Sequence, residues 1–186
     1  MFRKICFHIF KWFRPNMVRY KKLNGKKLQL TRVSNTTYIG NSKNLKLEDN
    51  VFIGHFNVID ASNGLTIKTG CQITNFISII THSSHNSIRY YGKQYAFHKE
   101  LKGYTKGAVV IGEYTFIGPH SLIAPGTKIG KGCIIKAYSY VQGEFPDFSI
   151  IEGNPAKIVG DTRTRDKIFL EANPQLNEFY NEWASK

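Results

Sequence analysis

The sequence predicts an all-β fold in which the chain winds as a parallel solenoid of short strands. An aliphatic residue occupies every sixth position from Ile111 to Val141. A glycine or alanine follows four of these residues, and a small or short residue stands four places after five of them. An α-helix, with about 3.6 residues per turn, cannot hold a six-residue period on one face. Short strands with tight corners can, if each aliphatic side chain points inward and the following glycine or alanine lets the corner turn.

The same period is present nearer the N-terminus. It shifts by two residues within the segment DASNGL and then resumes. Three six-residue units, about 18 residues, would make one triangular coil. Cys71 and Cys133 occupy small inward positions of this pattern, so we interpret both as packing residues rather than nucleophiles. The aliphatic residues of the repeat are Leu47, Ile53, Ile59, Ile67, Ile73, Ile79, Ile111, Ile117, Ile123, Ile129, Ile135 and Val141.

The repeat breaks after Ile79, and two histidines, His82 and His85, stand just beyond the break. Residues 83–107 do not keep the period and are rich in tyrosine, lysine and histidine. We therefore expect a projecting loop at about residues 82–108. Binding and catalytic residues concentrate on loops that a rigid scaffold holds in place.

The composition favours an anionic partner. Lys and Arg number 26 against 13 Asp and Glu, a formal net charge of +13. This charge suits nucleic acid, a membrane surface or a phosphate-rich cofactor. It is spread along the chain and no nucleic-acid-binding motif accompanies it, so we expect no nucleic acid as partner. Three scattered cysteines make no disulfide framework and have no zinc spacing, so a reducing cytoplasm is the simplest location.

The N-terminal region, residues 1–33, is a basic amphipathic segment that precedes the solenoid of residues 34–160. Apolar side chains recur at helical spacing in residues 1–14, and Pro15 closes this stretch. Such a helix either lies in a membrane interface, here the inner face of the membrane, or packs on its own protein or on a neighbouring subunit. Both alternatives stay open.

The C-terminal region, residues 161–186, is predicted to be a helical tail. Asn173 can cap a helix with Pro174 as its first residue. This helix would close the end of the solenoid or pack on a neighbour. Its apolar stripe consists of Leu176, Phe179, Tyr180 and Trp183.

About residues 35–160 resemble the hexapeptide-repeat acyltransferases, which fold as left-handed parallel β-helices. One block, NVFIGHFNVIDASNGLTIKTGCQITNFISIITHSSH, is similar to the branch that acetylates bacterial surface polysaccharides. A second block, VVIGEYTFIGPHSLIAPGTKIGKGCIIKAYSYVQGEFPDFSIIEGNPAKIVG, resembles the C-terminal coils and GNPA exit of sugar O-acetyltransferases. The resemblance implies transfer of acetyl from acetyl-CoA to a sugar hydroxyl, on a surface polysaccharide or its precursor. It also implies a homotrimer with active sites between subunits.

Acetyl transfer to a hydroxyl needs a base, and a neutral histidine suits this task at physiological pH. In the family, a histidine at the start of the projecting loop is the base, and this match falls on His82. His85 is the second histidine of the paired motif, and we expect it to orient His82, to contact the acceptor or to make local hydrogen bonds only. No serine or cysteine stands where a covalent intermediate would need it, which favours direct transfer.

The resemblance implies further contacts. On the acceptor side these are His55, Asn57 and Tyr91, although His55 and Asn57 also suit purely structural corner positions. The coenzyme contacts implied are Phe116, Pro119, Ala124, Lys136, Ala137, Gln142 and Lys157. This sequence departs from the family pattern in that group. Phe116 replaces a frequent tryptophan, Pro119 a serine or asparagine, and Gln142-Gly143 a threonine–lysine pair that supplies a cation.

Three other functions remain open. N-acetylation of a nucleotide-linked amino sugar would use the same fold and base, although Glu100 is the only acidic residue in the loop. A zinc enzyme of the carbonic anhydrase type would need three histidines, for which His82, His85, His98 and His120 are available. The spacing of His82 and His85 and the long loop disfavour this type, so we expect no metal. A non-catalytic nucleic-acid binder would depend on the positive charge alone.

Overall fold

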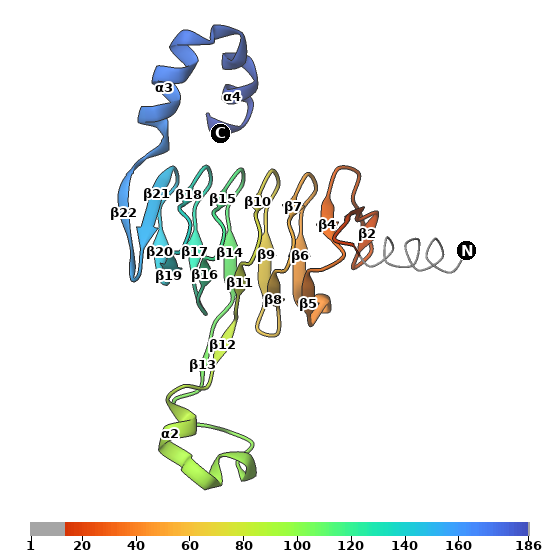
Figure 1. The fold of residues 1–186 in the computed structure, drawn as a ribbon, viewed down its shortest axis with the longest axis vertical. Coiled ribbons are helices and arrows are strands. Elements are labelled where there is room, and N and C mark those ends of the chain that lie inside the picture. The colour runs from red at the N-terminus through yellow and green to blue at the C-terminus, as the bar shows by residue number, and fades with distance from the viewer. Residues whose placement is uncertain (1–13, 186) are drawn as a thin grey trace, which may run out of the picture.

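The computed structural model describes residues 14–185, which form a coil of three parallel β-sheets with an arm and a helical tail (Figure 1). The first sheet contains β4 (Arg32–Ser34), β7 (Phe52–Ile53), β10 (Gln72–Ile73), β15 (Phe116–Ile117), β18 (Ile134–Ile135) and β21 (Ser149–Gly153). The second contains β5 (Tyr38–Gly40), β8 (Val58–Asp60), β11 (Ser78–Ile79), β16 (Leu122–Ile123) and β19 (Tyr140–Val141). The third contains β6 (Leu45–Leu47), β9 (Leu65–Ile67), β14 (Val109–Ile111), β17 (Lys128–Ile129) and β20 (Glu144–Phe145).

The chain visits the three sheets in turn and pairs each strand with the equivalent strand of the next coil. Two antiparallel strands complete the first sheet at its ends, β1 (Met17–Arg19) against β4 and β22 (Ala156–Asp161) against β21. A small hairpin of β2 (Lys22–Leu23) and β3 (Lys26–Lys27) lies near the N-terminal end, and a 3-10 turn, η1 (Ser42–Asn44), precedes β6. We call the passage from the first to the second sheet the first corner, and that from the second to the third sheet the second corner.

The predicted inward positions are confirmed. In the first sheet, Ile73, Ile117 and Ile135 pair in register, and each is 0% exposed. The aliphatic residues of the repeat are all buried in one continuous core. Cys71 and Cys133 are also buried, and burial raises the pKa of their thiols to about 12 and about 11, respectively. Both thiols are therefore neutral packing groups at physiological pH, as the repeat predicted.

The glycines of the repeat serve a different purpose from the one expected. Gly118 does not have a positive φ, but a Cβ on it would lie 2.6 Å from the amide nitrogen of Ala137 in the next coil. Gly112 and Gly130 have equally little room. These glycines let adjacent coils approach closely, whereas the turns themselves fall on other residues.

At the first corner, aromatic residues take the left-handed backbone conformation. Phe56, Phe76, His120 and Tyr138 have φ of 57°, 58°, 60° and 60°. Their rings stack from coil to coil with centroid distances of 5.2, 4.9 and 4.8 Å. Bulky residues rarely adopt this conformation, and aromatic stacking, worth about 0.5–1.5 kcal/mol per pair, offsets part of the strain.

The tail differs from the prediction at Asn173 and Pro174. Asp161 caps a first helix, α3 (Thr162–Ala172), by accepting a hydrogen bond from the amide of Arg163. Pro174 begins a single 3-10 turn, η3 (Pro174–Leu176), and the helix α4 follows as Asn177–Ala184. Asn173 does not cap α4; its side-chain amide donates to the carbonyl of Phe169 at 2.8 Å.

One residue of the predicted apolar stripe in the tail packs on the coil. The ring centroid of Trp183 lies 4.6 Å from that of Tyr114 and 5.9 Å from that of Phe148. The tail therefore packs on its own chain at the corner between the third and first sheets, whereas β22 is the last strand of the first sheet. It does not close the end of the solenoid in the way that the sequence predicted.

The basic segment of residues 1–14 lies outside the described residues except for Arg14, so its contact with a membrane or a neighbouring subunit stays a prediction. Among residues 14–185, no helix has the length and apolar character that crossing a membrane requires.

Ile135→Ala should lower the free energy of unfolding by about 2–5 kcal/mol, because it leaves a cavity where neighbouring coils cannot collapse. The adjacent Ile134 is the matched control, since it is only half-buried on the outer face of the same strand. We expect Ile134→Ala to cost less than about 1.5 kcal/mol. Urea denaturation of both variants measures the difference, and equal losses would contradict the inward and outward assignment.

Candidate active site

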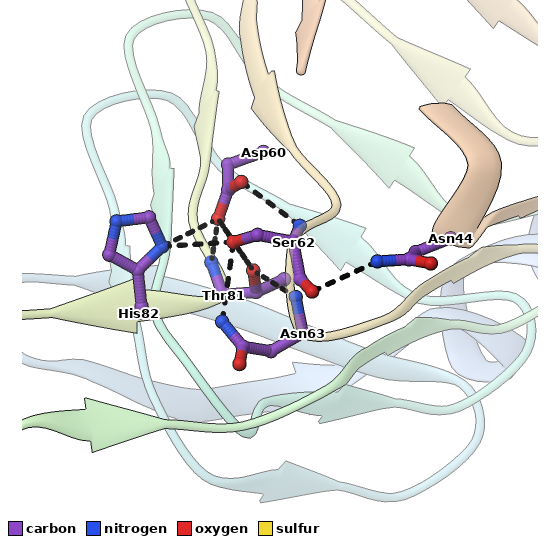
Figure 2. Close-up of polar contacts among 6 residues, drawn as sticks. All are labelled: Asn44, Asp60, Ser62, Asn63, Thr81 and His82. Atoms are coloured by element: carbon purple, nitrogen blue, oxygen red, sulfur yellow. Dashed lines mark hydrogen bonds and ion pairs between the residues drawn. The ribbon is translucent and has the colours of Figure 1, made fainter. Parts of the chain in front are cut away.

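The candidate site lies at the second corner, where the chain leaves the coil. Strand β8 ends at Asp60, and strand β11 of the next coil ends at Ile79. His82 then begins β12 (His82–Ser83). Because the coils stack, Asp60 and His82 lie side by side although they are 22 residues apart in the chain. Figure 2 shows them together with Ser62, Asn63 and Thr81.

Asp60 orients His82. Its Oδ2 lies 2.9 Å from His82 Nδ1, and the hydroxyl of Ser62 lies 3.1 Å from the same nitrogen. Asp60 also accepts hydrogen bonds from the amide and the hydroxyl of both Ser62 and Thr81. Burial disfavours the charged carboxylate, but these hydrogen bonds outweigh burial and hold the pKa of Asp60 well below its usual range. Asp60 is therefore a carboxylate at neutral pH.

The charge of Asp60 determines which ring nitrogen of His82 carries the proton. A carboxylate only accepts hydrogen bonds, so Nδ1 of a neutral His82 is the protonated nitrogen. The other nitrogen, Nε2, then has a free lone pair, and Figure 2 shows it pointing away from Asp60. The side chain of His82 is 40% exposed and that of Asp60 only 16%. A substrate can therefore reach the basic nitrogen while the orienting carboxylate stays sheltered.

Residues 82–107 form an arm that projects from the coil, as the break in the repeat predicted (Figure 1). The two strands at its base, β12 and β13 (Thr105–Lys106), pair antiparallel, with His82 opposite Lys106. Its outer part contains α2 (Ser87–Tyr91) and the 3-10 helix η2 (Gly92–Phe97).

Two contacts fix the base of the arm. The ring of Tyr104 stacks on His82 with a centroid distance of 5.7 Å and an interplanar angle of 6°. A Cβ at Gly107 would lie 2.6 Å from the amide nitrogen of Gly126, so the returning strand lies directly against the next coil. Because Tyr104 covers one face of the imidazole, a substrate can approach His82 only from the other face or from the ring edge.

His85 does not orient His82, because Asp60 has that role. The side chain of His85 is exposed, and its Nδ1 lies 2.8 Å from the hydroxyl of Ser83. Two of the predicted roles of His85 therefore stay open, namely contact with the acceptor and a purely local structural role. Ser62, which the sequence did not single out, contacts Nδ1 of His82, so the expectation that no serine stands where a covalent intermediate would need it stays a prediction.

The predicted acceptor residues lie in three different environments. Asn57 is 1% exposed; its amide group donates to the carbonyls of Gly54 and Thr74 and accepts from the amide of Ile77. Asn57 is therefore a structural corner residue with no polar atom left for an acceptor. His55 is at the first corner and lies 2.6 Å from the hydroxyl of Ser34 through Nδ1.

Tyr91 belongs to the arm. Its hydroxyl accepts from the amide of Lys102 at 3.1 Å, and its ring lies against His98. Within residues 14–185, neither Tyr91 nor His55 forms a hydrogen bond or a ring contact with His82, Asp60 or Tyr104.

The predicted coenzyme residues do not gather on one surface. Pro119 and Ala137 follow strands of the first sheet at the first corner, whereas Ala124 and Gln142 follow strands of the second sheet at the second corner. Ala124 is 0% exposed, so its side chain cannot touch a ligand and this assignment is wrong. The hydroxyl of Tyr140 donates to Gln142 at 3.1 Å.

The remaining three coenzyme candidates lie on the first sheet. Phe116 is 40% exposed on the outer face of β15. Lys136 pairs with Glu152 at 2.8 Å, so its charge is already partly compensated. Lys157 is exposed on β22. All three side chains are exposed, so accessibility does not distinguish among them.

The four histidines considered for a metal are not assembled. His120 stacks between Phe76 and Tyr138 at the first corner, and His98 lies in the arm against Tyr91. Within residues 14–185, no three histidine, cysteine, aspartate or glutamate side chains lie close enough together to hold a metal ion.

Comparison with known proteins supports the family resemblance. Residues 108–143 match the family model described as bacterial transferase hexapeptide (six repeats). A protein from Escherichia coli K12 that is named for O-acetyl transfer in lipopolysaccharide biosynthesis is 29% identical over 126 residues, which are 67% of this chain and 64% of that relative. The chain thus spans less than two thirds of this relative's length.

Two solved structures share the fold. A hexapeptide-repeat acetyltransferase from Vibrio cholerae, complexed with acetyl-CoA, is 20% identical with a TM-score of 0.62, over 75% of this chain and 72% of that one. An N-acyltransferase from Bacillus cereus, complexed with dTDP and coenzyme A, is 18% identical with a TM-score of 0.59, over 78% and 90% of the two chains. Residues 108–143 therefore carry the hexapeptide repeat of bacterial transferases, and the two solved structures share the fold of the chain.

Nuclear magnetic resonance can test the orientation of His82. At about pH 9, where histidine side chains are neutral, nitrogen–proton correlation spectra should show His82 protonated at Nδ1. Asp60→Ala should shift it towards the Nε2-protonated form, because the acceptor at Nδ1 is gone. His85 is the internal control, since its Nδ1 faces a hydroxyl that can donate or accept. A wild-type His82 protonated at Nε2 would refute the assignment.

Proposed function

We propose that the protein is an acetyl-CoA-dependent O-acetyltransferase that acts on a hydroxyl of a sugar, in a bacterial surface polysaccharide or its precursor. The observation that carries this proposal is the Asp60–His82 pair, which leaves a basic nitrogen exposed at the foot of a projecting arm. The named function of the Escherichia coli relative supports the reaction and the acceptor class. We further propose that the coil has the left-handed sense of the hexapeptide-repeat acyltransferases.

His82 acts as the general base in this proposal. When bound, acetyl-CoA supplies the acetyl group as a thioester. His82 Nε2 accepts the proton of the acceptor hydroxyl while the hydroxyl oxygen bonds to the acetyl carbon. The Asp60 carboxylate stabilises the positive charge that forms on the imidazole. His82 then gives the proton to the sulfur as the carbon–sulfur bond breaks.

Direct transfer fits the geometry better than a covalent acetyl-serine. Ser62 is near His82, but it contacts Nδ1, the nitrogen that carries a proton donated to Asp60. That nitrogen has no lone pair available to remove the serine proton, so Ser62 is not activated as a nucleophile. The acceptor hydroxyl at Nε2 is the group that His82 can activate.

A homotrimer with active sites between subunits would reconcile the two groups of coenzyme candidates. Ala137 and Gln142 lie at different corners of one coil, so a single coenzyme would contact both most easily where two copies meet. The second sheet also has an exposed apolar row on its outer face, which includes Tyr38, at 65% exposed, and Val58, at 49%. An apolar surface of this kind is typical of a contact between proteins.

The surroundings of His82 favour a hydroxyl over an amine as acceptor. Lys106 pairs with His82 across β12 and β13, and Asp60, the acidic residue that contacts the imidazole, is bonded to Nδ1 and not to Nε2. A protonated amine at Nε2 would therefore have no acidic residue bonded to that nitrogen to hold it. Transfer to an amino sugar, as the named function of the Bacillus cereus protein suggests, is the alternative. Transfer to an amino sugar would require that the amine is unprotonated when it lies at Nε2 of His82.

Calorimetric titration of acetyl-CoA into the wild type, His82→Ala and His85→Ala tests the proposal without a known acceptor. We expect similar dissociation constants for the three proteins, because neither histidine is required to hold the coenzyme. Thiol release with a set of sugars should then be about 10²–10⁴-fold slower for His82→Ala. His85→Ala should lose less than about tenfold.

Two outcomes would contradict this proposal. The absence of heat from all three proteins would remove acetyl-CoA as the donor. Coenzyme binding with undiminished thiol release by His82→Ala would keep the donor and remove His82 as the base. A loss in His85→Ala equal to that in His82→Ala would show that both histidines take part in the chemistry.

A further inference from the structure

A cleft with two lysines opens on the arm beside Tyr104, the ring that stacks on His82. It holds about 540 Å³ and is lined by Lys99, Glu100, Leu101, Tyr104 and Lys106. All of these residues come from the returning half of the arm. The size of the cleft suits a sugar residue with a substituent, and its lining is mostly polar.

The cleft is connected to His82 through one aromatic ring. Tyr104, which lines the cleft, is the ring that stacks on His82 at 5.7 Å. Lys106 stands opposite His82 in the β12–β13 pair, and its Nζ lies 5.5 Å from the centroid of Tyr104. A molecule in the cleft would therefore lie against the ring that stacks on His82.

The lysines of the cleft differ from three lysines on the coil that take part in ion pairs. On the coil, Lys68, Lys128 and Lys136 each pair with a glutamate of a neighbouring coil. Among the ion pairs of residues 14–185, none includes Lys99 or Lys106. Glu100 is the only acidic residue in the arm, against five lysines and arginines, namely Arg89, Lys93, Lys99, Lys102 and Lys106. The arm therefore presents uncompensated positive charge to whatever binds beside His82.

We propose that the acceptor sugar carries an anionic group, a carboxylate or a phosphate, and that Lys99 and Lys106 hold this group in the cleft. The proposal rests on the proposed function, because it takes His82 as the base. A lysine ammonium is a compact charge that binds either anion. Anchoring the anion in the cleft places a neighbouring hydroxyl of the same sugar at His82 Nε2. The arm would thus select anionic over neutral acceptors.

Binding of small acceptor analogues tests this selection. Methyl β-D-glucuronoside, glucose 6-phosphate and the neutral methyl β-D-glucoside would each be titrated while the ring signals of His82 and Tyr104 are followed by NMR. We expect at least one of the two anionic sugars to bind about tenfold more tightly than the neutral sugar, a difference of about 1.4 kcal/mol. The anionic sugar whose affinity exceeds that of the neutral sugar by the larger factor shows whether the cleft recognises a carboxylate or a phosphate.

A paired charge removal provides the control. The Lys99→Gln/Lys106→Gln variant should bind all three sugars equally weakly. The Lys26→Gln/Lys27→Gln variant removes the same charge from β3, outside the cleft, and should keep the preference. Lys106→Arg should also keep it, because the charge is retained.

The outcomes separate this inference from the proposed function. Equal binding of charged and neutral sugars would overturn it, as would a preference that survives in Lys99→Gln/Lys106→Gln. No shift of the His82 or Tyr104 signals with either anionic sugar, up to roughly 100 mM, would overturn it as well.

Acetyl-CoA is titrated into the same samples. A loss of coenzyme affinity in Lys99→Gln/Lys106→Gln, without a change in sugar preference, would assign the lysines to the coenzyme phosphates and refute the inference. Failure of acetyl-CoA to bind the wild type would instead count against the proposed function.

Discussion

The stacking of equivalent positions from coil to coil is the constraint on which the rest of this molecule depends. Each strand pairs in register with the strand one coil away, so residues far apart in sequence become neighbours across a single ladder of hydrogen bonds. The core of aliphatic residues, the close approach at Gly118 and the column of aromatic rings at the first corner all follow from it. The same stacking brings Asp60 to His82. A rigid ladder of this kind holds the Asp60 carboxylate against the His82 imidazole.

The arm interrupts the regular stacking of strands from coil to coil. It leaves at His82, returns at Lys106 and rejoins the coil through Gly107, which lies directly against Gly126. The tight junction at its foot keeps Tyr104 on one face of the imidazole. The scaffold therefore fixes His82 and its carboxylate partner, whereas the arm supplies the ring that covers one face of the imidazole. Under the proposed function, this division would place reactivity on the coil and selectivity on the arm.

The six-residue period was sufficient to predict the core residues, because inward positions repeat along the sequence. It also predicted where the arm leaves the coil and that His82 lies at this point. It could not reveal Asp60, because the partner of His82 lies one coil earlier and the two-residue shift in DASNGL hides the alignment. A short acidic residue at a corner one coil before the break is the signal that could have found it. The prediction for Asn57 failed because an amide inside a corner satisfies the backbone, which the sequence does not distinguish from an outward amide. The aromatic column was missed because aromatic residues seldom take a left-handed turn.

A double-mutant cycle on the rate of acetyl transfer tests whether Asp60 acts through His82. The rates of the wild type, Asp60→Asn, His82→Ala and the double variant would be compared under saturating acetyl-CoA. We expect Asp60→Asn to slow the wild type by at least about tenfold and to have no further effect once His82 is alanine, because residues that act as one unit are not additive. If the two losses simply add, Asp60 does not work through His82, and the orienting role assigned to Asp60 is wrong.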